Sequence, residues 1–492
     1  MTETLIWTGV AIYLLISGGV AFLARSGATG GMAGYFIGDR RVGGIISALS
    51  YSATTYSAFM MVGLAGLAYR GGVGALGFEI VYFAGVSLVA VFGPRFWAVG
   101  RRYGFVTPSE MLGHRYASPA VAATAAIASC LFLIPYSAVQ LSGIGYLMSG
   151  MTGGGISFGT GVVLATAIAL LFSYVAGIRS VLWTDSLQAL LMIIACSLVA
   201  IVVVEGLGGF GTLFGTIAAQ RPEMLTVPGP GLFSFVTFLG LTIPWFFFAL
   251  SNPQASQRLF MPASLGAMRR MLLIFLCFGL IYTVVSVLWG FSALVAFPGL
   301  ERPDLATATL LASDHVPPVL GMIVMIGILA AAISTIDSIL LTLSSMLARD
   351  VYAPLSGAGD QRQLWLGKLV IPVIAVLSLI FAALELDLIA LLSVAASAGL
   401  IVVVPSIVGA FFWRRGTAAG SIASMAGGGA FVIAMYATGN SLMGLPAGIL
   451  GLPVAAALFV GVSLATRPPQ IAADFIATAD AALAPRPKRG AV

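Results

Sequence analysis

The chain is divided almost end to end into apolar runs, each of which is long enough to cross a lipid bilayer. A membrane-spanning helix needs about 20 apolar residues, because the hydrocarbon core is about 30 Å thick and each residue advances the helix by about 1.5 Å. Only 8% of the 492 residues are charged, which is too few to cover a soluble fold of this length. The sequence therefore predicts an all-α integral membrane protein.

Thirteen transmembrane helices can be placed on this pattern. The predicted spans cover residues 5–24, 45–69, 76–99, 120–148, 158–176, 182–204, 232–250, 271–297, 319–347, 366–384, 388–413, 418–437 and 445–465. Glu385 and Asp387 separate the tenth and eleventh spans, which indicates a turn at the membrane surface. No Lys or Arg precedes the first span, so we expect a retained helix and not a cleaved signal peptide.

The 23 Lys and Arg residues are distributed unevenly among the predicted loops. With the N-terminus outside, 20 of the 23 fall in inner loops, and only Arg70, Arg221 and Arg302 fall in outer loops. Inner loops of membrane proteins carry an excess of Lys and Arg. We therefore expect a multi-pass protein of a prokaryotic inner membrane, with its C-terminus in the cytoplasm. The net charge of +6 follows from these loops and does not indicate a nucleic-acid partner.

A cluster of polar side chains interrupts the apolar run from Val319 to Leu347. It contains Ser334, Thr335, Asp337 and Ser338. An ionisable side chain at the centre of a transmembrane helix costs at least ~2.5–3.5 kcal/mol, so such residues indicate function. In a helix Ser334 and Ser338 lie one turn apart, with Thr335 and Asp337 beside them. We expect these oxygens to bind a small hard cation.

Two spans carry the marks of discontinuous helices. Every residue from Ser50 to Ser57 except Ala53 has a hydroxyl group, and the run from Pro244 leads into Ser251-Asn252-Pro253. Breaks at matching places in two halves of a bundle indicate a transporter binding site, because unwound backbone exposes carbonyls near the membrane midplane. An alternative is that the small residues only allow close helix packing.

The spacing of the two breaks predicts an inverted five-plus-five repeat. The domains would be an extra N-terminal helix with the loop leading into the core (1–44), a first repeat (45–204), a second repeat (232–413), two C-terminal helices (418–466) and a short cytoplasmic tail (467–492). The three cysteines, all in apolar segments, and the two histidines in loops do not form a catalytic or metal-binding pattern. We therefore do not expect an enzyme.

Four motifs resemble those of the sodium:solute symporter family, which includes proline, pantothenate, monocarboxylate, sialic acid and sodium-glucose cotransporters. They are residues 35–41, followed by a Gly-Gly pair, and residues 183–188, 252–258 and 331–338 leading to 349–352. The resemblance covers nearly the whole chain. It implies the LeuT-like fold and uptake of a small organic solute coupled to Na⁺, without an organic cofactor.

Carried over residue by residue, the resemblance also implies two ion sites. The sodium ligands would be the backbone carbonyls of Ala53, Tyr56 and Ala331 and the side-chain oxygens of Ser334 and Thr335. A second cation site would contain Asp185, Asp337 and Ser338. For Asp185 an alternative stays open, in which it caps the N-terminus of a helix and pairs with Arg179 at the inner surface.

The same resemblance implies a central solute pocket between the broken helices. Its predicted lining is Thr54, Thr55, Ser57, Glu79, Tyr136, Gln140, Trp245 and Phe248. Trp245 and Phe248 differ from what sugar carriers have at these positions, and Thr55 stands where proline carriers have an acid. We expect a small, partly apolar solute such as a monocarboxylate, an amino acid or a pantothenate-like carboxylate, whose anionic end meets helix-end amides.

Two alternatives remain for the function. In the first, the fold is the same but a proton on Asp337 or Asp185 replaces sodium as the coupling ion. In the second, the chain is a membrane sensor whose output lies on a partner protein. The partners that we expect are the lipid bilayer and the solute, with a monomer able to transport.

Overall fold

The computed structural model describes residues 2–24, 31–230, 233–385, 389–439, 441–481 and 483. The described residues are helical throughout, apart from turns and two isolated β-bridges, Val42 with Pro262 and Leu442 with Leu445. Ten helices are long and apolar enough to cross a membrane, or eleven when one sharply bent pair is counted as a single span. The predicted all-α membrane protein is thus confirmed.

The long apolar helices fall where the hydropathy pattern placed them. They are α1 (Glu3–Ala24), α5 (Gly74–Gly85) with α6 (Ser87–Tyr103), α8 (Pro119–Met151), α9 (Phe158–Gly206), α14 (Leu265–Ala296), α16 (Pro318–Met346) with η7 (Leu347–Tyr352) and α17 (Ala353–Ser356), α18 (Asp360–Ala382), α19 (Ile389–Leu400) with η8 (Ile401–Val403) and α20 (Val404–Phe412), α21 (Ala418–Ile422) with η9 (Ala423–Gly427) and α22 (Gly428–Thr438), and α23 (Ala447–Ala465). In α9 the backbone of Gly177 is non-helical, so two helical segments meet there.

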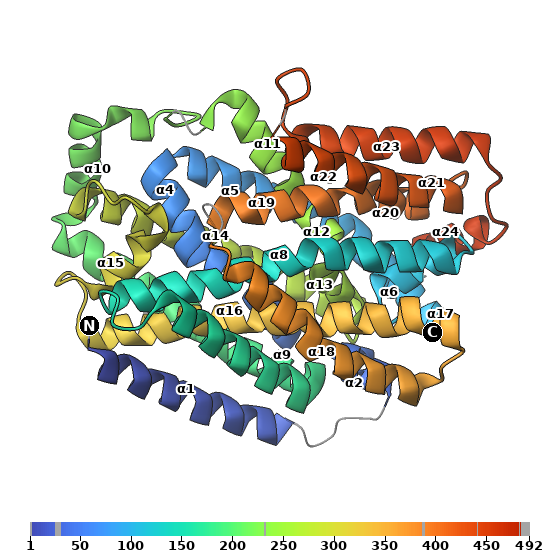
Figure 1. The fold of residues 1–492 in the computed structure, drawn as a ribbon, viewed down its shortest axis with the longest axis horizontal. Coiled ribbons are helices and arrows are strands. Elements are labelled where there is room, and N and C mark those ends of the chain that lie inside the picture. The colour runs from blue at the N-terminus through green and yellow to red at the C-terminus, as the bar shows by residue number, and fades with distance from the viewer. Residues whose placement is uncertain are drawn as a thin grey trace, which may run out of the picture.

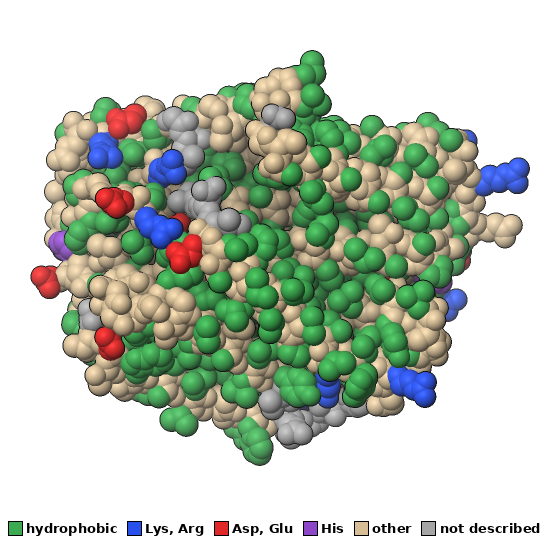
Figure 2. Space-filling view, in the orientation of Figure 1, with side chains coloured by type: hydrophobic (Ala, Val, Ile, Leu, Met, Phe, Trp, Pro, Cys, Tyr) green, Lys and Arg blue, Asp and Glu red, His purple; other side chains and the backbone are tan. Residues whose placement is uncertain are grey.

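These helices run side by side along the long axis of the molecule, with α1 at one edge and α23 at the other (Figure 1). α16 is among the most buried and packs along α9, so the polar cluster of the sequence lies at the centre of the bundle. Charged side chains gather toward the two ends of the long axis, and the belt between them is mostly hydrophobic (Figure 2). This distribution is expected for a protein whose middle contacts hydrocarbon.

The first predicted break is present. α3 (Gly44–Thr55) ends at Tyr56, and the chain resumes in the π-helical turn η2 (Phe59–Leu64) and α4 (Ala65–Gly71), bent by 49° from α3. The last four carbonyls of a helix have no partner inside it. The break therefore leaves backbone oxygens of α3 available in the middle of the bundle.

The second predicted break is also present. α11 (Phe235–Phe246) is followed by three short pieces, α12 (Phe248–Ser251), α13 (Pro253–Ser256) and η5 (Gln257–Phe260). The backbone of Asn252 is extended, and Pro253 supplies no N–H, so the helix cannot continue through this point. Gly240 and Pro244 lie inside α11, and the chain unwinds several residues after them.

Several short helices were not predicted from the hydropathy pattern. They are α2 (Met32–Ile37), η1 (Gly38–Arg40), α7 (Pro108–Arg115), α10 (Gly209–Gln220), η3 (Pro222–Leu225), η6 (Pro303–Leu305), α15 (Ala306–Ala312) and α24 (Ala472–Ala481). α24 lies in the predicted tail, where Tyr103 donates a 2.8 Å hydrogen bond to Asp474. The predicted turn after α18 begins as expected, with Glu385 in a left-handed conformation, while Asp387 lies outside the described residues.

The two ends of the bundle differ in charge. Arg40, Arg101 and Arg349 lie at one end, which we call the arginine-rich end. Arg101 donates to the backbone carbonyl of Arg40 at 3.0 Å, and Arg349 pairs with Glu110 of α7 at 2.9 Å. At the opposite end Arg302 lies 3.7 Å from Glu385.

Candidate ion and solute sites

The hydroxyl of Thr335 on α16 lies among three backbone carbonyls. Thr335 Oγ1 is 3.0 Å from the carbonyl oxygen of Thr54, 3.1 Å from that of Ala331 and 3.4 Å from that of Ala53. A hydroxyl has one proton and cannot donate it fully to three acceptors. The unwound end of α3 and the middle of α16 therefore form a buried pocket of oxygens, in which a cation would be stabilised. Thr54 was not among the three predicted backbone ligands; Tyr56, which was, caps α3 next to it.

Asp185 of α9 lies next to this group. Its two oxygens accept 2.6 Å hydrogen bonds from Ser334 and Ser50, and its side chain is buried. Because Ser334 donates its proton to the carboxylate, the lone pairs of its oxygen face away from Asp185. The alternative assignment of Asp185 as a helix N-cap paired with Arg179 is wrong, since Asp185 lies inside the segment that follows Gly177 and pairs with another arginine.

That arginine is Arg258 of η5. Its Nη2 is 3.2 Å from Asp185 and donates a 2.7 Å hydrogen bond to Ser338, and the side chain is 4% exposed. Ser338 is also 3.0 Å from the hydroxyl of Thr54. The sequence reasoning missed this ion pair. Arg258 follows the polar run from Ser251 to Gln257 and was counted among the inner-loop arginines, so its sequence neighbourhood gave no signal for a buried partner.

Asp337 has a hydrogen-bond partner of its own. Its Oδ1 accepts a 2.8 Å hydrogen bond from Ser173, in the first segment of α9. Residues three and four positions apart are neighbours on a helix surface, so Asp337 lies beside Ser334 at the edge of the face that Ser334 and Ser338 share. The hydrogen bond from Ser173 does not exclude a convergence of Asp337 with Asp185 and Ser338, which stays a prediction.

The predicted solute pocket is built around Trp245. The centroid of its ring lies 5.1 Å from that of Phe248, 5.0 Å from that of Phe59 and 5.7 Å from that of Tyr82. Its indole N–H donates to Oε2 of Glu79 at 3.3 Å. The sequence reasoning missed Phe59 and Tyr82, whose apolar surroundings gave no signal distinct from packing.

The remaining predicted pocket residues differ in their hydrogen bonding. Thr54 and Ser57 are engaged within the protein, since Thr54 meets Ser338 and the hydroxyl of Ser57 accepts from the amide of Phe59. Among the described residues, both amide atoms of Gln140 and the hydroxyl of Thr55 are buried without a hydrogen-bond partner. The centroid of the Tyr136 ring lies 6.0 Å from that of Phe248.

All eight predicted pocket side chains are at most 8% exposed, so the centre is closed to solvent. Oε1 of Glu79 also lacks a partner among the described residues. A buried polar atom without a partner costs about 1–3 kcal/mol. A bound solute with matching donors and acceptors would remove this cost.

The family model of the sodium:solute symporters matches residues 35–428, which is most of the chain. The chain belongs to the sodium:solute symporter family. It is therefore a multi-pass membrane transporter that couples the movement of a solute to sodium, and it is not an enzyme. These predictions are confirmed, and the matched range includes both broken helices and the polar cluster of α16.

Two characterised relatives are similar over nearly their full lengths. The sodium/pantothenate symporter of Escherichia coli (strain K12) is 28% identical over 447 residues, which cover 87% of this chain and 89% of the relative. The sodium/proline symporter of Staphylococcus aureus is 28% identical over 450 residues, covering 87% and 85%. The two relatives carry different solutes, so overall similarity leaves the solute of this symporter open.

Solved structures show the same fold. A Na⁺-coupled sialic acid symporter in a substrate-bound outward-open state matches with a TM-score of 0.77 at 20% identity, over 94% of this chain and 98% of that chain. Mhp1, a nucleobase-cation-symport-1 family transporter, matches with a TM-score of 0.57 at 13% identity, over 90% and 98%. The predicted LeuT-like architecture is supported at the level of the fold.

Proposed function

We propose that this symporter takes up a small organic solute with sodium, and that sodium binds where the end of α3 meets α16. The observation that carries the proposal is the crowding of the Thr335 hydroxyl by the carbonyls of Ala53, Thr54 and Ala331 within 3.4 Å. Carbonyl oxygens of unwound helices are the groups that hold Na⁺ in transporters with broken helices. The proposed ligands are the backbone of Ala53, Tyr56 and Ala331 and the side chains of Ser334 and Thr335.

Asp185 serves this site as a positioning residue. By accepting the proton of Ser334 at 2.6 Å, it turns the lone pairs of that hydroxyl toward the proposed ion. A second sodium ion at Asp185, Asp337 and Ser338 stays a prediction. Because the guanidinium of Arg258 already lies between Asp185 and Ser338, a second ion would require Arg258 to move.

The arginine-rich end is proposed to face the cytoplasm, with the N-terminus outside, since positive loops stay inside. The proposed thirteen spans add the short apolar helices Phe158–Tyr174 and Phe235–Phe246 to the eleven that satisfy length and composition. They would form an inverted pair of five-helix repeats over 45–204 and 232–413, with one helix before the pair and two after it. The tail from 467 would then lie in the cytoplasm.

The solute is proposed to carry both a carboxylate and a hydrogen-bond donor. Glu79 presents one unpartnered carboxylate oxygen, which needs a donor such as a hydroxyl, an amide or an ammonium group. The rings of Trp245 and Phe248 favour an apolar body between the two polar ends. Among the candidates, an amino acid or a pantothenate-like hydroxy acid fits better than a plain monocarboxylate, which has no donor.

Coupling follows from the position of α3 between the two sites. Sodium at Thr335 ties the broken end of α3 to α16, and Thr55 and Ser57 on the same segment border the solute pocket. Each ligand then stabilises the conformation that the other one needs, which is a reciprocal coupling of binding free energies. One charge crossing 100 mV adds ~2.3 kcal/mol to the driving force.

The test is the sodium dependence of thermal stability and of uptake by purified symporter in lipid vesicles. Thr335→Ala and Ser334→Ala should each raise the half-saturating sodium concentration about tenfold or more, because a hydrogen-bonding group to a charge contributes about 1.5–3 kcal/mol. Ser344→Ala is the matched control, since this buried serine of α16 bonds, among the residues that the structure describes, only to Leu341 of its own helix. Unchanged sodium dependence in both variants would remove the proposed site.

The same vesicles distinguish sodium from proton coupling. Asp337 is a buried carboxylate bonded to Ser173 and is the residue most suited to carry a proton. Uptake that persists in potassium buffer, and collapses when the proton gradient is dissipated, would decide for the proton. A screen of amino acids, hydroxy acids and monocarboxylates by thermal shift, with and without sodium, identifies the solute class.

A further inference from the structure

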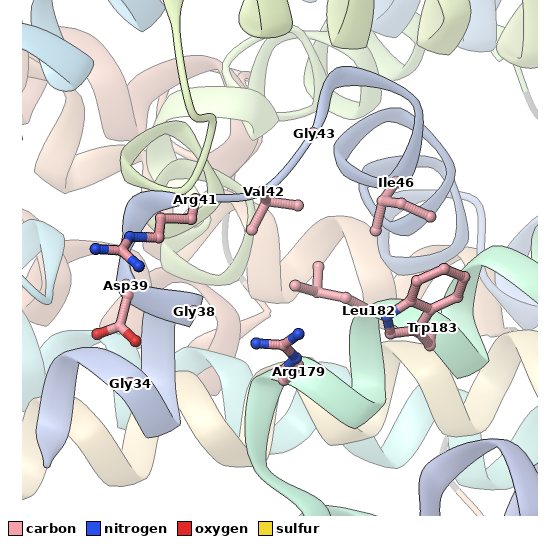
Figure 3. A pocket seen from close by; sticks show the side chains of 10 residues that line it. All are labelled: Gly34, Gly38, Asp39, Arg41, Val42, Gly43, Ile46, Arg179, Leu182 and Trp183. Carbon is pink, nitrogen blue, oxygen red and sulfur yellow. The ribbon is translucent and has the colours of Figure 1, made fainter. Parts of the chain in front are cut away.

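A polar cavity lies on the side of the bundle near the arginine-rich end, away from the central sites. Its volume is about 350 Å³, and it opens between the segment that leads from α2 into α3 and the second half of α9. Figure 3 shows Arg179 reaching up from α9 beneath this segment, with Leu182 and Trp183 on the same helix. Arg41 and Asp39 project from this segment on the side of the cavity away from Leu182 and Trp183.

The shape of this cavity is fixed by the protein. Gly38, Asp39 and Arg40 follow one another in left-handed backbone conformations, which non-glycine residues rarely adopt. Arg40 holds the segment by donating to the carbonyl of Phe105 at 2.9 Å, and Arg101 donates to the carbonyl of Arg40. A strained backbone that is held in place by its surroundings is typical of binding sites.

The charge of the cavity favours an anion with one negative charge. Its lining carries two guanidinium groups, Arg41 and Arg179, and one carboxylate, Asp39, which leaves a net charge of +1. A planar guanidinium matches the oxygens of a phosphate geometrically. The rest of the wall is apolar and includes Val42 and Leu182, so the site suits a group that is charged at one end only.

An exposed apolar stripe continues from the cavity along α9. Trp183, Leu187, Leu190 and Ile194 are 50%, 40%, 46% and 65% exposed, and their spacing of four, three and four residues places them on one face of the helix. A half-exposed tryptophan next to arginines is typical of the boundary between headgroups and hydrocarbon. The stripe is long enough to accompany an acyl chain, which a free phosphate ion would not need.

We propose that this cavity binds the phosphodiester headgroup of an anionic phospholipid, with one acyl chain along the stripe from Trp183 to Ile194. Basic pockets at the cytoplasmic side of membrane helices are suited to such headgroups. The site does not depend on which solute is carried. The cavity lies between the start of α3 and α9, about one helical turn before the point where Ser50 of α3 bonds to Asp185 of α9. A bound lipid would therefore hold these two helices together beside the ion site.

The experiment measures lipid retention by native mass spectrometry of the detergent-purified, full-length symporter titrated with phosphatidylglycerol or phosphatidylcholine. The wild type should retain one phosphatidylglycerol at least tenfold more tightly than phosphatidylcholine. The double variant Arg41→Gln/Arg179→Gln should lose this preference. The matched control Arg414→Gln/Arg467→Gln removes the same charge from exposed positions outside the cavity and should keep it.

Two results would overturn the proposal. One is an equal loss of phosphatidylglycerol in both double variants, which would indicate a general charge effect. The other is displacement of the lipid by inorganic phosphate or glycerol 3-phosphate at hundredfold excess, which would assign the cavity to a small soluble anion. The Arg41→Gln/Arg179→Gln variant should keep its sodium-dependent thermal stabilisation, which shows that it is folded. A loss of its lipid preference is then distinguished from a failure of the proposed sodium site.

Discussion

The side-chain oxygen of Gln257 accepts a 2.6 Å hydrogen bond from the hydroxyl of Thr342. The same amide donates to the carbonyl of Val106 at 2.9 Å and to Ser345 at 3.2 Å. One buried side chain on η5 therefore joins the second broken helix to α16 and to the segment before α7. This junction lies between the ion site and the arginine-rich end, where η7 with Arg349 follows α16.

Replacing Gln257 with Leu should weaken this junction. The change keeps a similar volume but removes three hydrogen bonds, each of which contributes about 0.5–1.5 kcal/mol. We expect faster hydrogen exchange in η5 and η7 of the sodium-free protein, because the end opens more often. Ser256→Ala is the control, since the hydroxyl of this neighbouring buried residue has no partner among the described residues. Equal exchange in the two variants would contradict a role for Gln257 in holding this end together.

The ion pair of Asp185 and Arg258 predicts a non-additive pair of substitutions. Asp185→Asn alone leaves a buried guanidinium without its counter-charge, which typically costs about 3–5 kcal/mol. Arg258→Gln alone leaves the carboxylate unpaired. The double variant removes both charges and should therefore recover much of the thermal stability lost in either single variant.

The sodium response of the same variants tests a separate point. Since Asp185 orients Ser334, we expect Asp185→Asn to raise the half-saturating sodium concentration in the double variant too. A double variant as unstable as the sum of the single ones would show that the two residues act independently. Thermal unfolding in detergent, with sodium replaced by potassium at constant ionic strength, measures both effects.

The sequence predicted the spans, both breaks and the oxygen cluster of α16 because each depends on a local signal. Runs of apolar residues, hydroxyls in a row and proline after asparagine are visible without tertiary structure. The partner of Asp185 depends on distance in space, and Arg258 is 73 residues away along the chain. Nothing local distinguishes Arg258 from the loop arginines, so the ion pair could not be assigned from spacing alone.

The hydrogen-bond partner of Asp337 also depends on distance in space. A helix places Asp337 beside Ser334, but the sequence does not show which neighbouring helix faces it. Ser173, 164 residues away along the chain, donates to Asp337 because α9 packs along α16. Short surface helices such as α24 were missed because their polar faces hide them in a hydropathy profile.

Asp304, outside the membrane spans, predicts a pH dependence of stability. Burial raises the pKa of this carboxyl from 3.8 to about 6, and the amide of Ile389 and the nearby Arg302 and Arg70 oppose the shift. The folded state therefore holds the proton more tightly than the unfolded state. The stability that protonated Asp304 contributes is fully present below pH 3.8 and is lost as the pH rises through about 6.

Asp304→Asn should remove the loss of stability at higher pH, because the asparagine does not ionise. Its side-chain oxygen can still accept from the amide of Ile389. At pH 7.5 the variant should be more stable than the wild type by up to about 3 kcal/mol, since each pKa unit corresponds to about 1.4 kcal/mol. At pH 4 the two should differ little. Asp314→Asn, at an exposed acid of the same end, serves as the control in thermal unfolding scans at both pH values. Equal pH profiles of wild type and Asp304→Asn would contradict the prediction.

Glu79→Gln separates the candidate solutes by the chemistry of their donor. The variant can still accept from the indole N–H of Trp245, but its neutral amide cannot supply a negative charge to an ammonium group. An ammonium donor makes a charge-assisted hydrogen bond of about 1.5–3 kcal/mol, whereas a hydroxyl contributes about 0.5–1.5 kcal/mol. An amino-acid solute should therefore bind tenfold or more weakly, and a hydroxy acid only a few-fold more weakly. The measurement is the concentration of solute that gives half of the sodium-dependent thermal shift, with exposed Glu205→Gln as the control. Unchanged affinity in Glu79→Gln would place the donor of the solute elsewhere and would reopen plain monocarboxylates as candidates.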